Sequence, residues 1–135
     1  QWTTWNDSPL LIDDANNHAA AIALRQYVDT LERPVTWVMG MLSTKDHEDI
    51  FEALLRPNDE LHLVPVPGHS SADPEELATL AIQVCPRLNN CQTHQDVAQA
   101  LDMAITQSDQ DPDRLTILCG SLYLIGSISC LKQNT

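Results

Sequence analysis

A polar turn near the start of the sequence carries residue types that bind nucleotides. Asp13 directly follows the apolar run Leu10–Ile12, and Asn16 and Asn17 come next, before an alanine-rich stretch. A carboxylate at the end of a strand can accept two hydroxyl hydrogen bonds from a ribose, or it can cap the helix that follows. In open α/β sheets, ligands bind where strands end and helices begin. We therefore predict that Asp13, Asn16 and Asn17 form one part of a binding site.

A second turn, near the end of the sequence, suits an anion. Gly120 and Ser121 directly follow the apolar run Leu115–Cys119. The glycine allows a close approach of the backbone, and a hydroxyl with free N–H groups at a helix start can bind a substrate carboxylate. A tight turn with a capping serine is the alternative interpretation. Lys45 could neutralise a phosphate in the same crevice, although an exposed lysine beside Asp46 is the more common arrangement.

Alternating apolar runs and amphipathic stretches must position these turns. The clearest helix start is Asp73-Pro74-Glu75-Glu76, with Asp at the N-cap and Pro at the first helical position. Five β-α units predict an α/β fold, a Rossmann-like, mostly parallel sheet with helices on both faces. Parallel strands end on one edge, so the two turns should meet there, together with the proline-rich loop Pro65–Ala72. The predicted strands are Leu10–Asp13, Val35–Met39, Glu60–Val66, Asn90–Thr93 and Leu115–Cys119.

Composition limits the classes of function. Nineteen acidic and seven basic residues give a formal net charge of -12, which repels nucleic acids and anionic membranes. The sequence has no GxxxxGK[ST] loop and no GxSxG motif, and its five histidines lack HxxxH or HExxH spacing. We therefore expect no self-contained triphosphate site and no metal site, and we assign no catalytic residue. Four cysteines without a CxxC pair indicate reduced, structural thiols and a cytoplasmic location.

The beginning of the chain reads as a piece of a longer protein. Gln1 is not a methionine, and Trp2 and Trp5 lie in a short polar lead-in. We expect residues 1–8 to be the remnant of an interdomain linker. Residues 9–135 have the length of one domain with its own core.

Four stretches of the sequence carry a family resemblance that covers almost the whole chain. They resemble motifs of the C-terminal domain of folylpolyglutamate synthase and dihydrofolate synthase, in the Mur ligase superfamily, with a cyanobacterial branch as the nearest relative. The resemblance implies the fold of a Mur ligase C-terminal domain. The stretches are LIDDANNHAAA from Leu11, VTWVMGMLSTKD from Val35, SSADPEELA from Ser70 and LCGSLYLIG from Leu118.

The resemblance implies the C-terminal lobe of an ATP-dependent, ADP-forming ligase. In the family, ATP phosphorylates a folate carboxylate, and the amine of L-glutamate attacks the acyl phosphate, so that a γ-linked glutamate tail is extended. Asp13 matches the aspartate that holds the ribose of ATP, and Ser121 falls near the pocket for the incoming glutamate. The phosphate loop and the Mg²⁺ ligands are expected in the protein's own N-terminal ATPase domain, so the isolated chain should be inactive. Folate and L-glutamate are the expected substrates.

The first motif departs from the family pattern at three positions. Asp14 stands where the family has glycine, Asn16 where it has histidine and His18 where it has proline. Asp14 adds a negative charge near an anionic ligand, and Asn16 carries no charge. Two alternatives therefore stay open: another Mur-type ligase lobe with an altered nucleotide turn, and a non-catalytic binding module.

Overall fold

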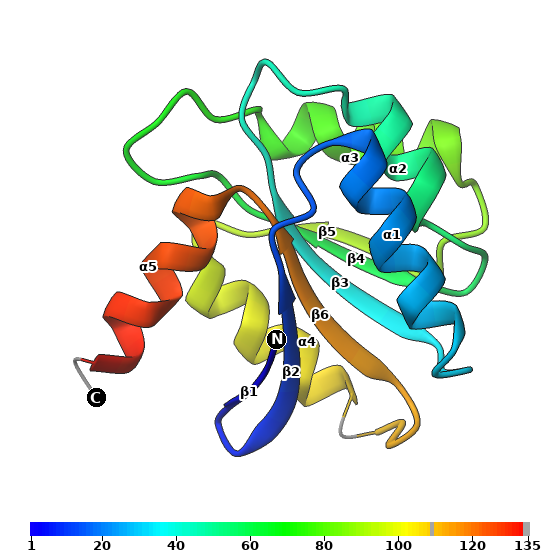
Figure 1. Cartoon of the computed structure of the whole chain (residues 1–135), viewed down its shortest axis with the longest axis vertical. Coiled ribbons are helices and arrows are strands. Elements are labelled where there is room, and N and C mark those ends of the chain that lie inside the picture. Colours follow the sequence, from blue (N-terminus) through cyan, green and yellow to red (C-terminus); the bar gives the residue numbers. More distant parts are fainter. Residues whose placement is uncertain (109, 134–135) are drawn as a thin grey trace.

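In the described part of the chain, residues 1–108 and 110–133, six strands form one sheet and five helices cover its faces (Figure 1). This computed structural model leaves the side chains of residues 129–133 undescribed. The strands are β1 (Trp2–Trp5), β2 (Ser8–Asp13), β3 (Val35–Gly40), β4 (Glu60–Leu63), β5 (Asn90–Thr93) and β6 (Leu115–Gly120). The helices are α1 (His18–Asp29), α2 (His47–Leu54), α3 (Pro74–Val84), α4 (Val97–Ser108) and α5 (Leu122–Gln133). None of the described helices is long and apolar enough to cross a membrane.

The strand order confirms the predicted Rossmann-like α/β fold. The strands follow one another across the sheet as β1-β2-β6-β3-β4-β5. The neighbouring pairs β2/β6, β6/β3, β3/β4 and β4/β5 are parallel, and the pair β1/β2 is antiparallel. Every residue of β3 and of β6 is buried, as their continuous apolar sequences predicted. The two central strands therefore form the rigid floor on which the carboxyl-edge turns are placed.

Two apolar clusters form the core, one on each face of the sheet. One face of the sheet packs against α1, α2 and α3, and the other packs against α4 and α5 (Figure 1). The strands alternate between the clusters, since Trp37 and Met39 of β3 belong to the first and Val38 to the second. Helices on both faces explain why both central strands lack a polar side.

The strand β1 was not predicted, because the sequence analysis treated residues 1–8 as a linker remnant. Trp2–Trp5 instead pairs with β2 through a two-residue turn, in which Asn6 and Asp7 have φ angles of 49° and 65°. Positive φ at both central positions is typical of the type I′ turn of a tight hairpin, where Asn and Asp are favoured. Whether a domain boundary falls after residue 8 stays a prediction.

The tryptophans of this hairpin bind helices on both sides of the sheet. Nε1 of Trp2 donates to the hydroxyl of Tyr27 in α1 at 3.1 Å. Nε1 of Trp5 donates to Oδ1 of Asp102 in α4 at 2.8 Å. The two indoles lie three positions apart on a strand and therefore point to opposite faces. The hairpin thus connects the two helical layers at the edge of the sheet.

The predicted cap of α3 is present, and α1 is capped by an asparagine. Oδ1 of Asp73 accepts a hydrogen bond from the N–H of Glu75 at 2.9 Å, with Pro74 at the first position of α3. Oδ1 of Asn17 accepts from the N–H of Ala20 at 2.9 Å. The predicted third strand is shorter than expected, because β4 ends at Leu63, before the proline-rich loop begins.

The described cysteine thiols are free. Cys85 and Cys119 are buried and Cys91 is half-buried, and none of these three forms a disulfide. Burial raises the pKa of Cys91 and of Cys119, so both stay protonated at neutral pH. The side chain of Cys130 lies outside the described residues. The three thiols behave as structural groups within the core.

Asp59 is the centre of a buried polar network at the amino edge of the sheet. Its carboxylate accepts hydrogen bonds from Nε1 of Trp37 at 3.0 Å, from the N–H of Arg56 at 3.1 Å and from Arg25 at 3.3 Å. Asp59 is buried, and this burial raises its pKa. The network connects α1, β3 and the turn before β4.

We expect Asp59→Ala to lower the free energy of unfolding by about 2–3 kcal/mol, because it leaves the buried Trp37 indole and the N–H of Arg56 without their acceptor and removes the ion pair with Arg25. Urea unfolding of the variant and the wild type measures this difference. Asp29→Ala is the matched control, since Asp29 binds the same arginine, at 2.9 Å, from an exposed position. The control should cost less than about 1 kcal/mol. Equal losses in both variants would contradict the role of Asp59.

Candidate functional site

The carboxyl ends of three neighbouring strands bring the two predicted turns together. β2 and β3 both pair with β6, and the register places Asp13 opposite Cys119 and Gly40 opposite Gly120. Asp13 therefore lies on the neighbouring strand, one residue out of register with Gly120. This edge is where open parallel sheets bind ligands. The prediction that the two turns are neighbours in space is confirmed.

Asp13 is half-buried at the end of β2, and it is not the cap of the following helix. The cap of α1 is Asn17, whose side-chain oxygen binds the N–H of Ala20. The N–H of Ala15 donates to the Asp13 carboxylate, while burial and the charge of Asp14 raise the pKa of Asp13. The capping interpretation of Asp13 is therefore wrong, and its carboxylate is left to face the edge of the sheet.

The other two predicted residues of this turn have separate positions. Asn16 is half-buried between Asp13 and the helix start, and Asn17 is exposed. The amide oxygen of Asn17 is engaged in capping, so its amide nitrogen is the group that can reach a ligand. The turn thus offers one carboxylate and two amides at the carboxyl edge.

Gly120 cannot be replaced by a residue with a side chain without moving the backbone. Its φ is 121°, in the region that favours glycine. A Cβ atom at Gly120 would lie 2.3 Å from the carbonyl oxygen of Gly40. The two glycines therefore allow the ends of β3 and β6 to come close together. This close approach fixes where Ser121 begins the next turn.

Ser121 is buried and caps α5 with its hydroxyl, which accepts a hydrogen bond from the N–H of Tyr123 at 3.1 Å. Its own N–H donates to the carbonyl of Gly40 at 3.0 Å. Of the N–H groups that were expected to be free at this helix start, those of Ser121 and Tyr123 are engaged, and the alternative of a capping serine holds. The hydroxyl proton is the group of Ser121 that is left to bind a ligand.

The loop that carries Lys45 is fastened to the proline-rich loop. The N–H of Ser43 donates to the carbonyl of Ser70 at 2.9 Å, and the N–H of Ala72 donates to the carbonyl of Met41 at 2.8 Å. Lys45 is half-buried in this loop. Among the described residues, the Lys45 ammonium makes no ion pair. The structure therefore places Lys45 on the same edge, but does not bring it into the two turns.

A family model for the C-terminal domain of dihydrofolate synthetase matches residues 1–133. The chain belongs to this family. Dihydrofolate synthetase of Saccharomyces cerevisiae is 31% identical over 128 residues, which are 89% of this chain and 30% of the yeast protein. The relationship to a cyanobacterial branch of the family, which the motifs indicate, stays a prediction.

Solved structures of folylpolyglutamate synthases share the fold of this chain. Folylpolyglutamate synthase of Mycobacterium tuberculosis, complexed with ADP, is 27% identical with a TM-score of 0.77, over 94% of this chain and 30% of that one. A bifunctional folylpolyglutamate synthase/dihydrofolate synthase with Mn, AMPPNP and L-glutamate bound is 26% identical with a TM-score of 0.75, over 98% of this chain and 30% of the other. The chain thus spans about a third of the length of its relatives.

The described residues contain no group of three or more His, Cys, Asp or Glu side chains arranged to hold a metal ion. At the carboxyl edge, the groups of the first turn that can bind a ligand are carboxylates and amides. A carboxylate such as Asp13 fits the hydroxyls of a ribose, whereas the adjacent Asp14 repels a triphosphate. The turn therefore offers one carboxylate that can accept hydrogen bonds from hydroxyl groups and, next to it, a second carboxylate that disfavours anions.

A histidine pair that sequence reasoning missed lies towards the carboxyl ends of β4 and β5, on the opposite side of β3 from the two predicted turns. Nδ1 of His62, in β4, is 2.9 Å from Nε2 of His94, which follows β5. His62 is completely buried, and burial together with the facing His94 lowers its pKa to about 4. The sequence contained one signal, a histidine within an apolar strand pattern, but nothing in it identified His94 as the partner.

We expect the free energy of unfolding to fall by about 3 kcal/mol through His62 as the pH drops from 6.5 to about 4. The unfolded histidine takes up a proton in this range and the folded one does not, so the stabilisation is complete above pH 6.5 and is lost towards pH 4. His62→Gln should flatten this part of the curve in urea unfolding at several pH values. His18→Gln, at an exposed histidine, should keep the wild-type dependence.

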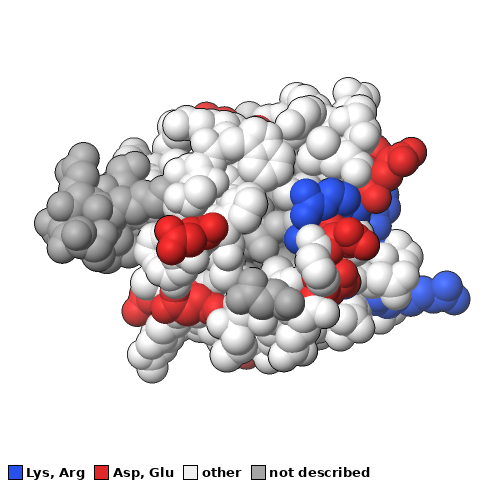
Figure 2. All heavy atoms as spheres, turned by 90° about the horizontal axis from the view of Figure 1, so that it is seen from below, with Lys and Arg blue, Asp and Glu red and all other residues white. Residues whose placement is uncertain are grey.

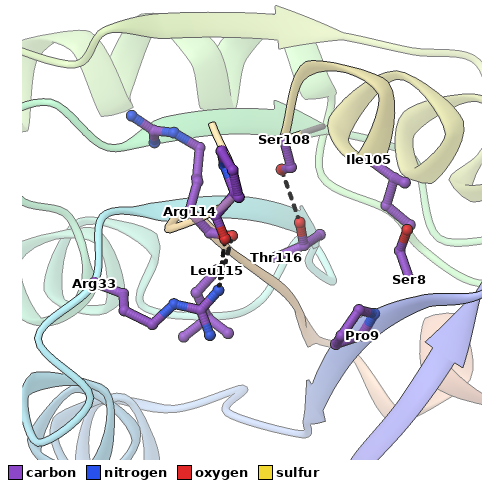
Figure 3. A pocket seen from close by; sticks show the side chains of 9 residues that line it. Ser8, Pro9, Arg33, Ile105, Ser108, Arg114, Leu115 and Thr116 are labelled. Atoms are coloured by element: carbon purple, nitrogen blue, oxygen red, sulfur yellow. Dashed lines mark hydrogen bonds between the residues drawn. The ribbon is translucent and has the colours of Figure 1, made fainter. Parts of the chain in front are cut away.

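A pocket of about 260 Å³ lies at the opposite edge, where β2 and β6 begin (Figure 3). Nε of Arg33 donates to the carbonyl of Asp113 at 2.7 Å, and Arg114 donates to the carbonyl of Val35 at 2.9 Å. Figure 2 shows the molecule from this side, with basic and acidic side chains next to each other. Because both guanidinium groups bind main-chain carbonyls, they connect the segments around the pocket. None of the predicted site residues lines it.

Proposed function

We propose that this chain is the C-terminal lobe of an ATP-dependent, ADP-forming ligase that joins L-glutamate to a pteroate or folate carboxylate. The observation that carries the proposal is the adjacency of Asp13 and the Gly120–Ser121 corner on neighbouring strands. One edge of the sheet can thereby hold the ribose of ATP beside the amino acid that attacks the acyl phosphate formed with ATP. Membership of the dihydrofolate synthetase family supports this assignment.

In this proposal, Asp13 holds ATP by its ribose. The carboxylate accepts hydrogen bonds from both ribose hydroxyls, with Asn16 and the amide nitrogen of Asn17 beside it. The phosphates and Mg²⁺ would be bound by the protein's own ATPase domain, because this chain has no GxxxxGK[ST] loop and its described residues hold no group of metal ligands. Lys45 is the basic residue of this edge that can approach a phosphate or the acyl phosphate when the domains close. Related enzymes crystallised with ADP, or with Mn and AMPPNP, support the use of a nucleotide and a metal by the parent protein.

The chemistry proceeds in two steps in which this lobe orients the reactants. ATP transfers its γ-phosphoryl group to the substrate carboxylate, giving an acyl phosphate and ADP. The amine of L-glutamate then attacks the acyl carbon, and phosphate leaves as the amide forms. The Ser121 hydroxyl binds a carboxylate of the glutamate, and closure of the lobe excludes water from the acyl phosphate. An isolated lobe lacks the phosphate-binding half and is inactive.

Two acceptors are compatible with this chemistry. A folylpolyglutamate synthase extends the glutamate tail of a folate, as the motifs of this chain implied. The family model and the yeast relative, both named for dihydrofolate synthetase, favour joining the first glutamate to a dihydropteroate carboxylate.

The free thiols of Cys85, Cys91 and Cys119 support a reducing compartment such as the cytoplasm.

The test measures incorporation of labelled L-glutamate by the full-length parent protein, with dihydropteroate and with tetrahydrofolate as separate acceptors. We expect ATP-dependent incorporation with at least one acceptor, and one ADP released for each amide formed. The chain of residues 1–135 alone should incorporate none. No incorporation with either acceptor would contradict the ligase assignment and favour the non-catalytic binding module. A GxxxxGK[ST] loop upstream of Gln1 is a second requirement of the proposal.

A further inference from the structure

A stacked pair of aromatic rings connects the proline-rich loop to the start of α5. The rings of His69 and Tyr123 lie with centroids 3.5 Å apart and an angle of 16° between their planes. His69 is exposed near the end of the loop, and Tyr123 is 51% exposed. Two exposed rings held in this way gain from stacking but little from burial, so the contact is not a part of the apolar core.

The base of this loop is fixed independently of the stack. The N–H of Val66 donates to Oγ of Ser71 at 2.9 Å, and Ser71 forms an antiparallel bridge with Leu42. Between these fixed points, Gly68 has a φ of 74° and nothing within 4 Å of the position that a Cβ would occupy. His69 follows directly after this open turn. The ring of His69 therefore sets where the end of the loop lies relative to α5.

Tyr123 is also connected to the corner that we assign to glutamate. Its N–H donates to the Ser121 hydroxyl at 3.1 Å, and the N–H of Ser121 donates to Gly40 at 3.0 Å. A chain of direct contacts thus runs from His69 through Tyr123 to Ser121. The residue that carries the stacked ring thus also binds the Ser121 oxygen, through its backbone N–H.

We propose that His69 and Tyr123 are positioning residues for the amino-acid substrate. Their stack holds the loop 65–72 against the start of α5 and keeps the Ser121 hydroxyl in the orientation that receives the glutamate carboxylate. The inference rests on the proposed function of the Gly120–Ser121 corner. It adds that the loop 65–72 and the Gly120–Ser121 corner act as one unit. Asp13, which we assign to the ribose, lies on β2 and is not part of this unit.

The test compares Tyr123→Leu, Tyr123→Phe and His69→Ala in the full-length protein. Tyr123→Leu and His69→Ala should each raise the KM for L-glutamate roughly 2- to 10-fold, as expected for loss of an aromatic pair, with the KM for ATP unchanged. Tyr123→Phe keeps the ring and should keep the wild-type KM. The double variant should be no worse than either single variant, because both remove the same contact.

Tyr27→Leu is the matched control, since Tyr27 is the other tyrosine of the chain and is similarly exposed, on α1. It should leave the KM for glutamate unchanged. Additive effects of Tyr123→Leu and His69→Ala on the KM for glutamate, or an unchanged KM in Tyr123→Leu, would overturn the proposal. Hydrogen exchange of the amides of residues 66–72 gives a readout without turnover: faster exchange in Tyr123→Leu than in Tyr123→Phe is expected, and equal exchange overturns the proposal. If the wild type incorporates no glutamate, the ligase assignment fails while the exchange result still decides on the stack.

Discussion

Asp13→Ala in the full-length enzyme is expected to raise the KM for ATP roughly 10- to 100-fold, because a hydrogen bond to a charged group contributes about 1.5–3 kcal/mol. The carboxylate is half-buried and does not cap α1, so the substitution removes the proposed ribose contact without removing a helix cap. Steady-state kinetics with varied ATP measures the effect. The KM for L-glutamate should change little, because Ser121 lies on the other turn.

Discrimination between nucleotides separates ribose binding from a general loss of structure. The wild type should use 2′-deoxyATP poorly, since one hydroxyl partner of Asp13 is missing, and Asp13→Ala should use ATP and 2′-deoxyATP about equally. Asp14→Asn is the matched control at the adjacent, exposed carboxylate. It should lower the KM for ATP or leave it unchanged, because it removes a negative charge near the phosphates. An Asp13→Ala enzyme that keeps the wild-type KM and discrimination would remove the ribose role.

The arrangement of the edge was predictable because it depends on topology more than on side-chain detail. The apolar runs of β3 and β6 are long enough to identify buried parallel strands, and parallel strands end on a common edge. That rule alone placed Asp13 beside Gly120. The start of α3 was predictable for a different reason, since Asp73 and Pro74 form a local signal that needs no tertiary contact.

What could not be predicted depends on contacts between distant segments. The sequence shows that Ser121 can cap a helix, but not that its N–H would be taken by Gly40, 81 positions earlier. The pairs His62–His94 and His69–Tyr123 likewise join segments that no local pattern relates. The strand β1 is a different case, since the turn residues Asn6 and Asp7 were a readable hairpin signal. It was missed because the tryptophans beside it were interpreted as part of a linker.

Gly120→Ala is expected to lower the free energy of unfolding by about 3–5 kcal/mol, from the strain of a positive φ and from the clash of the new methyl group. The clash is with backbone, since the Cβ would lie 2.3 Å from the carbonyl oxygen of Gly40, and a strand in the centre of a sheet cannot move aside as a surface side chain can. Urea unfolding of the chain measures this loss.

A second glycine in the same region provides a control of opposite sign. Gly126 lies within α5, is exposed, and has nothing within 4 Å of an added Cβ. Gly126→Ala should therefore raise the free energy of unfolding by about 0.5–1 kcal/mol, because alanine loses less conformational freedom than glycine in a helix. Losses of similar size in both variants would mean that the corner does not have the close approach described for Gly40 and Gly120. Opposite signs would show that the corner requires glycine for its geometry, and that the position of Ser121 is set by the backbone of two neighbouring strands.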